Sequence, residues 1–457
     1  MVNNKHIFFL GIGGIGMSAL ARYFKSCGDE ISGYDKTETE LTRNLVNEGI
    51  HVIYRDDVSA LTDGIDMVIY TPAIPQSLSL YLDLKARPIP FLKRSEVLGS
   101  LSRNQKNIAI AGTHGKTTTS LLVAHILYDT GIPMTAFLGG IASNYNNNFL
   151  QSGEDWFVLE ADEYDRSFLH LTPDIAAIGS LDADHLDIYG DRTSMVQSYL
   201  QFASQVKEEG VLLLSDTIAA EDRISVNQSV SSNVRVEIFG LNNFENSSVV
   251  VEHSEGKVRF HYTENSQVVI PNLQMRLPGE HNIRNAIAAI RIARILKIAP
   301  EKISKALATF SGIYRRFEIL LEGPNAVLID DYAHHPEELR SAIHTCNLAY
   351  KGRKVTGIFQ PHLYSRTKDF LNEFAEVLDG LDQIILVELY PARELPIEGI
   401  SSQSIYDKLK NKKKYLTTKK ELLELLKTLE TDVVLMMGAG NLDVMREQIK
   451  KTIEEKQ

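Results

Sequence analysis

Short hydrophobic runs alternate with longer helical patterns along most of the chain. Residues 7–10 and 31–35 have the apolar character of strands, and apolar residues recur at helical spacing between residues 17 and 24. The same order of strand, loop and helix returns at residues 107–129 and again after residue 313. This alternation predicts an α/β fold with mainly parallel sheets, whose ligands bind at the carboxyl ends of the strands.

The pattern predicts three domains, because 457 residues are too many for one hydrophobic core. We expect a Rossmann-like domain in residues 1–105 and a second Rossmann-like domain in residues 313–457. Between them, residues 106–312 are expected to form a P-loop ATPase-like parallel sheet. Short alternating strands in residues 211–275 predict a small antiparallel annex to it. The lysine-rich residues 408–420 are expected to form a solvated helix face and its loop.

Composition narrows the class of protein. A net charge of −11 excludes nucleic acid as the main partner, since proteins that bind the phosphate backbone need a basic surface. The chain has no run of about 18 apolar residues, so we expect no membrane insertion. Four glycines in residues 11–16 also interrupt an N-terminal stretch that faintly resembles a signal peptide. Two cysteines cannot form a disulfide framework, which fits the cytoplasm.

Residues 108–119, Ile-Ala-Ile-Ala-Gly-Thr-His-Gly-Lys-Thr-Thr-Thr, join an apolar run to a helical pattern through a glycine loop. In such loops, backbone N–H groups and the positive helix end bind phosphate, a lysine reaches the outer phosphates, and a hydroxyl suits Mg²⁺. The usual pattern needs a glycine where this chain has Ile110, so the loop is two residues shorter. The predicted nucleotide-binding residues are Gly112, Thr113, His114, Gly115, Lys116, Thr117 and Thr118.

Acidic residues follow two further apolar runs of this region. Glu160 begins one acidic group, and residues 182–187, which include His185, contain the other. Carboxylates at the carboxyl ends of parallel strands supply the hard oxygen ligands that Mg²⁺–ATP needs, although each one could instead cap a helix. Asn282 and Asn285 are spaced to share a helix face, where amides suit an adenine edge; helix capping also accounts for asparagine there.

The N-terminal glycines fit the pattern G-x-G-x-x-G between a predicted strand and a predicted helix. An acidic residue follows 19 positions after the last of them, as in dinucleotide-binding proteins, where it contacts a ribose hydroxyl. A turn that merely lets a helix pack on a strand would need similar glycines. The candidate ligand-binding residues here are Gly11, Gly13, Gly14, Gly16, Asp35 and Thr71.

Three nucleotide-type regions with a single phosphate-loop lysine predict an enzyme that binds ATP and another phosphorylated substrate. An NAD-dependent dehydrogenase would account for residues 11–16 but would leave Lys116 without a role. A switch-type nucleotide hydrolase would account for Lys116 but for neither of the other domains. A non-enzymatic nucleotide sensor would need neither the carboxylates nor a third domain, whereas ATP-dependent ligation uses every part.

Several motifs resemble those of the Mur ligase family, and they follow one another in family order over nearly the whole chain. They are the shortened phosphate loop and residues 11–18, 160–163, 184–187, 281–285, 315–317, 331–336, 360–362 and 438–440. The resemblance implies an ATP- and Mg²⁺-dependent ligase that joins L-alanine to the carboxylate of UDP-N-acetylmuramate through an acyl phosphate, in peptidoglycan precursor synthesis. It implies that the first glycine loop binds the UDP-sugar diphosphate instead of NAD. A close alternative re-attaches a recycled murein peptide to the same sugar nucleotide.

The resemblance also implies roles for single residues. We expect a monomer or a homodimer, between which the sequence does not decide. Lys116 would stabilise the transferring phosphoryl group, and Arg366 would pair with the carboxylate of the incoming amino acid. The implied residues are Lys116, Glu160, His185 and Arg315 for catalysis; Thr117, Glu160 and His185 for Mg²⁺; Asn282, Asn285, Arg316 and Asp331 for the nucleotide; and His334 and Arg366 for the amino acid.

Three features distinguish the chain within the family. Leu363 stands where many relatives have arginine, so recognition of alanine is expected to rest on His334 and Arg366. Ser180 stands where asparagine is common. Residues 191–206 contain no lysine, whereas later-acting ligases carry a modified lysine there, so the sequence favours the alanine-adding reaction.

Overall fold

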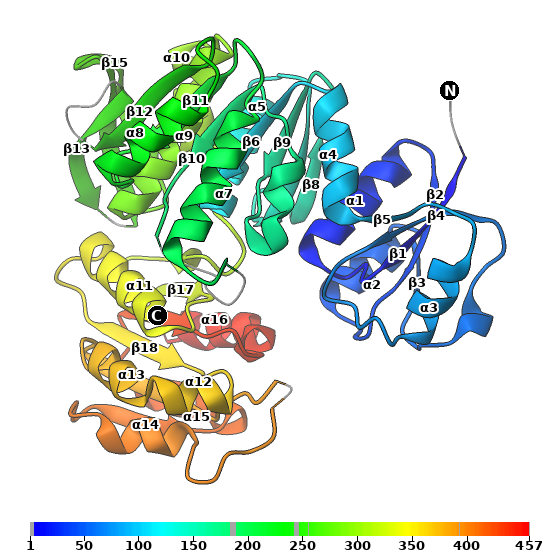
Figure 1. The fold of residues 1–457 in the computed structure, drawn as a ribbon. Coiled ribbons are helices and arrows are strands. Elements are labelled where there is room, and N and C mark those ends of the chain that lie inside the picture. Colours follow the sequence, from blue (N-terminus) through cyan, green and yellow to red (C-terminus); the bar gives the residue numbers. More distant parts are fainter. Residues whose placement is uncertain (1–3, 183–188, 242–245, 255, 393, 457) are drawn as a thin grey trace. The chain divides into compact units, whose positions relative to one another are not determined.

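The computed structural model describes residues 4–182, 189–241, 246–254, 256–392 and 394–456 (Figure 1). It is an α/β protein with three separate sheets, which confirms the predicted fold class. The contacts divide the chain into two units, Met1–Val249 with His261–Leu273 and His281–Phe310, and Val250–Phe260 with Gln274–Glu280 and Ser311–Gln457. None of the described helices combines the length and apolar composition that crossing a membrane requires.

The first sheet is parallel, with the strand order β3-β2-β1-β4-β5. The order reverses direction between β1 and β4, so this point of the carboxyl edge is where doubly wound sheets bind ligands. The elements are β1 (His6–Leu10), α1 (Ile15–Ser26), β2 (Glu30–Tyr34), α2 (Glu40–Asn47), β3 (His51–Ile53), η1 (Val58–Ala60), β4 (Ile65–Tyr70), α3 (Ser79–Ala86), β5 (Phe91–Lys93) and α4 (Arg94–Asn104).

The second sheet has ten strands in the order β15-β14-β13-β12-β11-β10-β6-β9-β7-β8. Helix α5 is buried from Thr117 to Leu127, which explains the almost unbroken apolar run after the phosphate loop. The elements are β6 (Asn107–Ala111), α5 (Lys116–Asp129), β7 (Met134–Ala142), β8 (Asn147–Gln151), β9 (Trp156–Glu160), η2 (Tyr164–His170), β10 (Ile175–Ile178), α7 (Arg192–Ser204), β11 (Val211–Ser215), α8 (Ala220–Ser229), β12 (Arg235–Leu241), β13 (Asn246–Ser254), β14 (Lys257–Glu264), β15 (Gln267–Met275), α9 (Glu280–Ile295) and α10 (Pro300–Thr309).

One expectation about this sheet is wrong in detail. Strand β12, which was assigned to the antiparallel annex, pairs in parallel with β11. It therefore extends the main sheet. Strands β13, β14 and β15 continue the same sheet, so the annex is the end of one continuous sheet.

Helix α1 of the first sheet packs against the second sheet within the same unit. The ring of Tyr23 contacts the rings of Phe137 and Phe157, with centroid separations of 5.4 and 5.8 Å. Beside them, the buried Arg22 donates to Asn148 of β8 and to Glu48. These contacts join the two sheets through one hydrophobic core.

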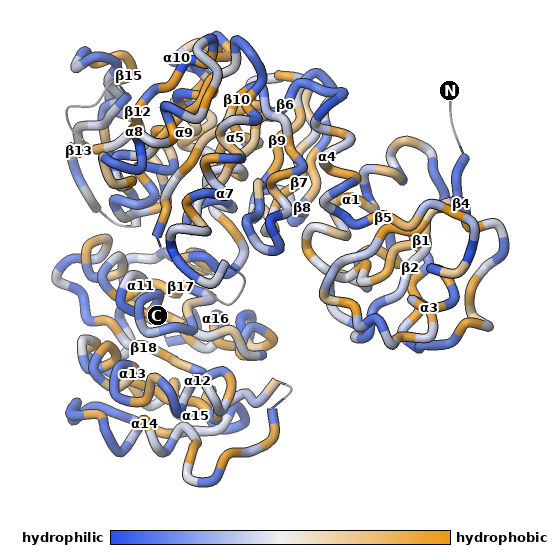
Figure 2. The backbone as a smooth tube through the Cα atoms, viewed as in Figure 1, coloured by the Kyte–Doolittle hydropathy of each residue, from blue (hydrophilic) through white to orange (hydrophobic). Residues whose placement is uncertain are grey.

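The third sheet has the order β16-β17-β21-β18-β19-β20 and is parallel except for β16. Its central strands are hydrophobic along their length (Figure 2), because helices cover both faces and form two core clusters. The elements are β16 (Glu318–Glu322), β17 (Val327–Asp331), α11 (Pro336–Ala349), β18 (Val355–Phe359), α12 (Tyr364–Asp369), α13 (Leu371–Leu378), β19 (Gln383–Val387), α14 (Ser402–Lys408), β20 (Lys414–Thr417), α15 (Lys419–Thr428), β21 (Val433–Met437), η3 (Leu442–Met445) and α16 (Arg446–Glu454). The lysine-rich stretch thus contains an edge strand, β20, that the sequence did not predict.

Candidate active site

The phosphate loop joins β6 to α5 and depends on two glycines. Gly112 has a φ of +131°, and a Cβ added there would lie 2.9 Å from the backbone nitrogens of Gly179 and Ser180. Gly115, the N-cap of α5, has a φ of +78° and would place a Cβ 2.6 Å from Asn285 Oδ1. Both positions exclude a side chain because of conformation and space together.

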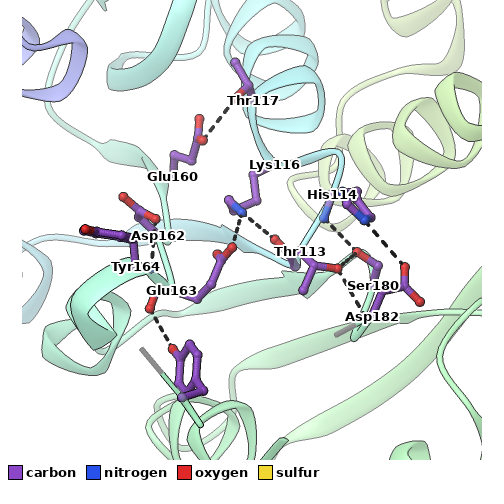
Figure 3. A network of polar contacts seen from close by, with 12 residues as sticks. Thr113, His114, Lys116, Thr117, Glu160, Asp162, Glu163, Tyr164, Ser180 and Asp182 are labelled. Atoms are coloured by element: carbon purple, nitrogen blue, oxygen red, sulfur yellow. Dashed lines mark hydrogen bonds and ion pairs between the residues drawn. The ribbon is translucent and has the colours of Figure 1, made fainter. Parts of the chain in front are cut away.

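Ser180 holds the first part of this loop (Figure 3). Its Oγ accepts a hydrogen bond from the His114 N–H at 2.8 Å and lies 2.8 Å from Thr113 Oγ1, while its carbonyl accepts from the Thr113 N–H at 3.3 Å. The first intrahelical donor of α5 is the Thr119 N–H, which bonds to Gly115 O. The helix end at Lys116, Thr117 and Thr118 is therefore the part of the loop suited to an anion.

Lys116 lies between the loop and the segment after β9, with polar partners on both. Its Nζ donates to Gly112 O and to Glu163 Oε1, both at 2.7 Å. The side chains are 14% and 1% exposed, so this is a buried ion pair. Burial raises the pKa of Glu163, and the nearby ammonium opposes that change. Tyr189 fixes the same segment by donating from its hydroxyl to Glu163 O at 2.6 Å.

Thr117 and Glu160 lie side by side, as the sequence predicted for a magnesium site. Thr117 Oγ1 donates to Glu160 Oε1 at 3.0 Å, and Gly139 N donates to Glu160 Oε2 at 3.0 Å. Two neighbouring ligands of an octahedral Mg²⁺ ion with bonds of about 2.1 Å are about 3.0 Å apart, so this hydroxyl and carboxylate fit the ion. Among the described residues, no three side chains of aspartate, glutamate, histidine or cysteine lie close enough together to bind a metal ion. His185, the third predicted ligand, lies outside them.

The two predicted adenine-binding residues occupy one face of α9. Asn285 Nδ2 lies 3.5 Å from Asn282 Oδ1. Because a Cβ added at Gly115 would lie 2.6 Å from Asn285 Oδ1, α9 places the Asn285 amide beside the start of α5. The structure thus joins two motifs that are 170 residues apart in sequence.

The first glycine loop follows β1 at the reversal point of its sheet. Gly11 has a φ of +87°, and a Cβ there would lie 2.6 Å from Thr71 Cγ2, so these two predicted residues are neighbours. Gly14 is the N-cap of α1, without a side-chain cap. Asp35 Oδ2 accepts the Gly13 N–H at 2.9 Å, so this carboxylate braces the loop. Gly16, in the first turn of α1, lies against the guanidinium of Arg94.

The Arg315–Arg316 pair divides into a buried and an exposed side chain. Arg315, 6% exposed, donates to Gly438 O and to Gly440 O and forms ion pairs with Asp330 and Asp443. Burial raises the pKa of Asp330 to about 6, while its arginine neighbours oppose the rise. Arg316 is exposed. This geometry assigns Arg315 to the support of the glycine turn after β21.

Asp331 ends β17 and organises the adjoining backbone. Its Oδ2 accepts the Phe317 N–H at 2.7 Å and its Oδ1 accepts the Ala333 N–H at 2.8 Å. Burial raises the pKa of this carboxyl group. A carboxylate has about four acceptor positions, so Asp331 retains capacity for another hydroxyl.

His362 lies next to both His334 and Arg366, the two residues predicted to bind the amino acid. The rings of His334 and His362 are 6.2 Å apart, and Arg366 Nη1 lies 3.4 Å from His362 Nδ1. Burial lowers the pKa of both imidazoles, and Arg366 adds to that effect. A guanidinium beside two imidazoles suits a ligand with a carboxylate and an amine.

Sequence reasoning missed four residues of these sites. Glu163 and Gly139 support Lys116 and Glu160, His362 links His334 to Arg366, and Arg94 touches the first glycine loop. Glu163 stood in a recognised motif, and its contact with Lys116 depends on the order of β6 and β9. No local pattern identifies Arg94, which follows the short strand β5.

Comparison with known proteins finds three domains of one protein family, one after another along the chain. Residues 6–106 match the sequence profile of the Mur ligase family catalytic domain, residues 110–293 that of the Mur ligase middle domain, and residues 315–440 that of the Mur ligase glutamate ligase domain. The UDP-N-acetylmuramate–L-alanine ligase of Flavobacterium psychrophilum is 45% identical over 100% of both chains. The chain belongs to the Mur ligase family.

Two further proteins support the same family, and a third shares its fold. The UDP-N-acetylmuramate–L-alanine ligase of Christiangramia forsetii is 44% identical over 98% of both chains. The crystal structure of the UDP-N-acetylmuramate–alanine ligase of Thermotoga maritima matches with a TM-score of 0.82 and 28% identity, over 99% of this chain and 100% of that one. A murein peptide ligase of Psychrobacter arcticus matches with a TM-score of 0.66 and 19% identity over 98% of both chains, which is a likeness of fold alone.

Proposed function

We propose that this Mur ligase joins L-alanine to the carboxylate of UDP-N-acetylmuramate, with ATP as the phosphoryl donor and Mg²⁺ as the cofactor. The observation that carries the proposal is the meeting of Lys116, Thr117 and Glu160 at one phosphate loop. Full-length similarity to relatives named as L-alanine ligases supports the choice of substrates. The cytoplasmic location and the oligomeric state stay predictions.

In this reaction, the lactyl carboxylate of the sugar nucleotide attacks the γ-phosphorus of ATP, and the bond to the ADP oxygen breaks. The amine of L-alanine then attacks the acyl phosphate, loses a proton, and forms a tetrahedral intermediate. That intermediate collapses to the amide and inorganic phosphate. The lactyl carboxylate and the γ-phosphate that it attacks are both anionic, so positive groups supply most of the stabilisation.

The phosphate-loop residues have separate tasks. The positive end of α5 binds phosphate oxygens, and Lys116 neutralises charge on the transferring phosphoryl group. Thr117 and Glu160 would hold Mg²⁺, with His185 as a further ligand, and the ion would supply Lewis-acid charge at the phosphates. Asn285 and Asn282 would orient the adenine.

The C-terminal residues serve the remaining contacts. Arg316 is preferred over Arg315 as the phosphate ligand, since the buried Arg315 already supports the turn after β21. Asp331 would accept a ribose hydroxyl. Arg366 would pair with the carboxylate of L-alanine, and His334 would lie near its amine.

The N-terminal glycine loop would bind the diphosphate of UDP-N-acetylmuramate. Gly11, Gly13, Gly14 and Gly16 keep the backbone open at the positive end of α1, and Thr71 borders the same reversal point. Asp35 braces this loop through Gly13 and would contact the nucleotide ribose.

The test supplies ATP, Mg²⁺ and UDP-N-acetylmuramate together with L-alanine, glycine, L-serine or murein tripeptide in parallel. We expect phosphate release and a UDP-muramoyl product with the highest kcat/KM for L-alanine. A preference for the tripeptide would assign the chain to peptide recycling. The absence of a UDP-muramoyl product from every acceptor would contradict ligase function.

A further inference from the structure

Arg94 touches two functional segments of the first unit. It is the first residue of α4, and its Nη1 lies so close to Gly16 that a Cβ added there would be 2.1 Å away. Its Nη2 lies 3.5 Å from Asp162 Oδ2, in the acidic segment that begins at Glu160. The side chain is 23% exposed, so it is largely enclosed.

The surroundings of Arg94 favour an anion beside it. Gly16 belongs to the first turn of α1, which has no acidic residue and no side-chain cap at Gly14. A helix start carries a partial positive charge, which disfavours a second positive group unless a negative one joins them. Asp162, which lies in the acidic segment after β9 (Figure 3), offsets part of that charge.

We propose that Arg94 is a substrate-binding residue that donates to the diphosphate of the sugar nucleotide. This inference rests on the proposed function, because it assumes that a nucleoside diphosphate sugar binds at the first glycine loop. Guanidinium groups suit this task, since two parallel N–H donors match a pair of phosphate oxygens. Asp162 acts as a positioning residue that holds the guanidinium towards Gly16.

A purely structural role would make Arg94 a link between α4 and the acidic segment. The adjacent Lys93 provides a matched comparison, because its Nζ lies 3.3 Å from Asp165 Oδ2 and so joins the same two segments. Only Arg94 also reaches the glycine loop. Replacing each residue by glutamine therefore separates ligand binding from the connection of the segments.

The experiment measures the Kd of UDP-N-acetylmuramate and of UDP by calorimetry, in the full-length protein without ATP. We expect R94Q to weaken both ligands by about 10- to 100-fold, as loss of a charged hydrogen bond to phosphate would do. K93Q should bind both ligands within about twofold of wild type, the range in which hydrogen-bond loss is negligible. The Kd of ATP should be unchanged in both variants.

R94K keeps the charge and protects the test against misfolding of R94Q. It should bind UDP-N-acetylmuramate between wild type and R94Q, because an ammonium cannot donate in a fork. Equal Kd values for wild type, R94K and R94Q would overturn the inference. A wild-type protein that binds the sugar nucleotide but forms no L-alanine product would contradict the proposed function alone, and the R94Q comparison would still decide the role of Arg94.

Discussion

Replacing Glu163 by glutamine tests how the phosphate-loop lysine is held before ATP binds. In the structure, Lys116 Nζ contacts Glu163 Oε1 at 2.7 Å, in a pair that is almost enclosed. In the proposed reaction, the same ammonium serves the phosphates. The account therefore predicts that Lys116 exchanges its carboxylate partner for ATP, so that Glu163 stabilises the protein without ATP more than the protein with ATP.

The magnitude follows from the burial of the pair. Removing one partner of a buried ion pair costs roughly 3–5 kcal/mol. Glutamine keeps an acceptor oxygen, and Lys116 keeps the Gly112 carbonyl and is 14% exposed, so we expect a loss of about 2 kcal/mol without ATP. With the phosphates in place the loss should be small. E163Q should thus bind ATP roughly 30-fold more tightly than wild type, since about 1.4 kcal/mol corresponds to tenfold.

The assay is calorimetric titration with a non-hydrolysable ATP analogue and Mg²⁺, supported by thermal unfolding with and without the analogue. E208Q is the control, because Glu208 is exposed and the variant has the same change of charge. The reasoning is refuted if E163Q binds the analogue no more tightly than E208Q does. That result would mean that Lys116 keeps Glu163 as its partner in both states.

Three further predictions concern other parts of the protein. Lys116→Ala should abolish phosphate release and leave the Kd of UDP-N-acetylmuramate near wild type; lost sugar binding would contradict the separation of the two sites. Asp35→Ala should weaken UDP-N-acetylmuramate about tenfold through the Gly13 contact, with an unchanged Kd for ATP, as calorimetry would reveal. Because the folded protein lowers the pKa of His334 and His362, the unfolded chain binds more protons below the ordinary value of about 6.5. The free energy of unfolding should therefore keep its full value above that pH and fall as the pH decreases through the lowered pKa values. Urea unfolding measured over this pH range should show a smaller fall for His362→Gln than for wild type.

Local patterns predicted the parts of the site that depend on neighbouring residues. The order strand, glycine loop and helix defines the phosphate loop, because each of these elements has its own sequence signal. The contact of Thr117 with Glu160 was also predictable, since acids at the ends of parallel strands gather at one edge. Strands β6 and β9 are neighbours in the sheet, and this pairing places Glu160, at the end of β9, beside the loop that follows β6.

Contacts that depend on strand order or on chain reversals were beyond the sequence. Strand β12 pairs in parallel with β11, whereas the sequence predicted an antiparallel annex, because alternating residues do not distinguish parallel from antiparallel neighbours. The edge strand β20 was missed, since edge strands carry charged residues that conceal their pattern. The burial of Arg315 depends on Gly438 and Asp443, more than 120 residues away, so no local pattern shows that its side chain supports the turn after β21.

The central claim is tested most directly by following an oxygen atom of the sugar nucleotide. UDP-N-acetylmuramate labelled with ¹⁸O in the lactyl carboxylate is incubated with the protein, ATP, Mg²⁺ and L-alanine, and the products are analysed by mass spectrometry. We predict one ¹⁸O atom in the released inorganic phosphate and one in the new amide, because the carboxylate becomes an acyl phosphate before L-alanine attacks. Unlabelled phosphate, or no UDP-N-acetylmuramoyl-L-alanine, would contradict the account.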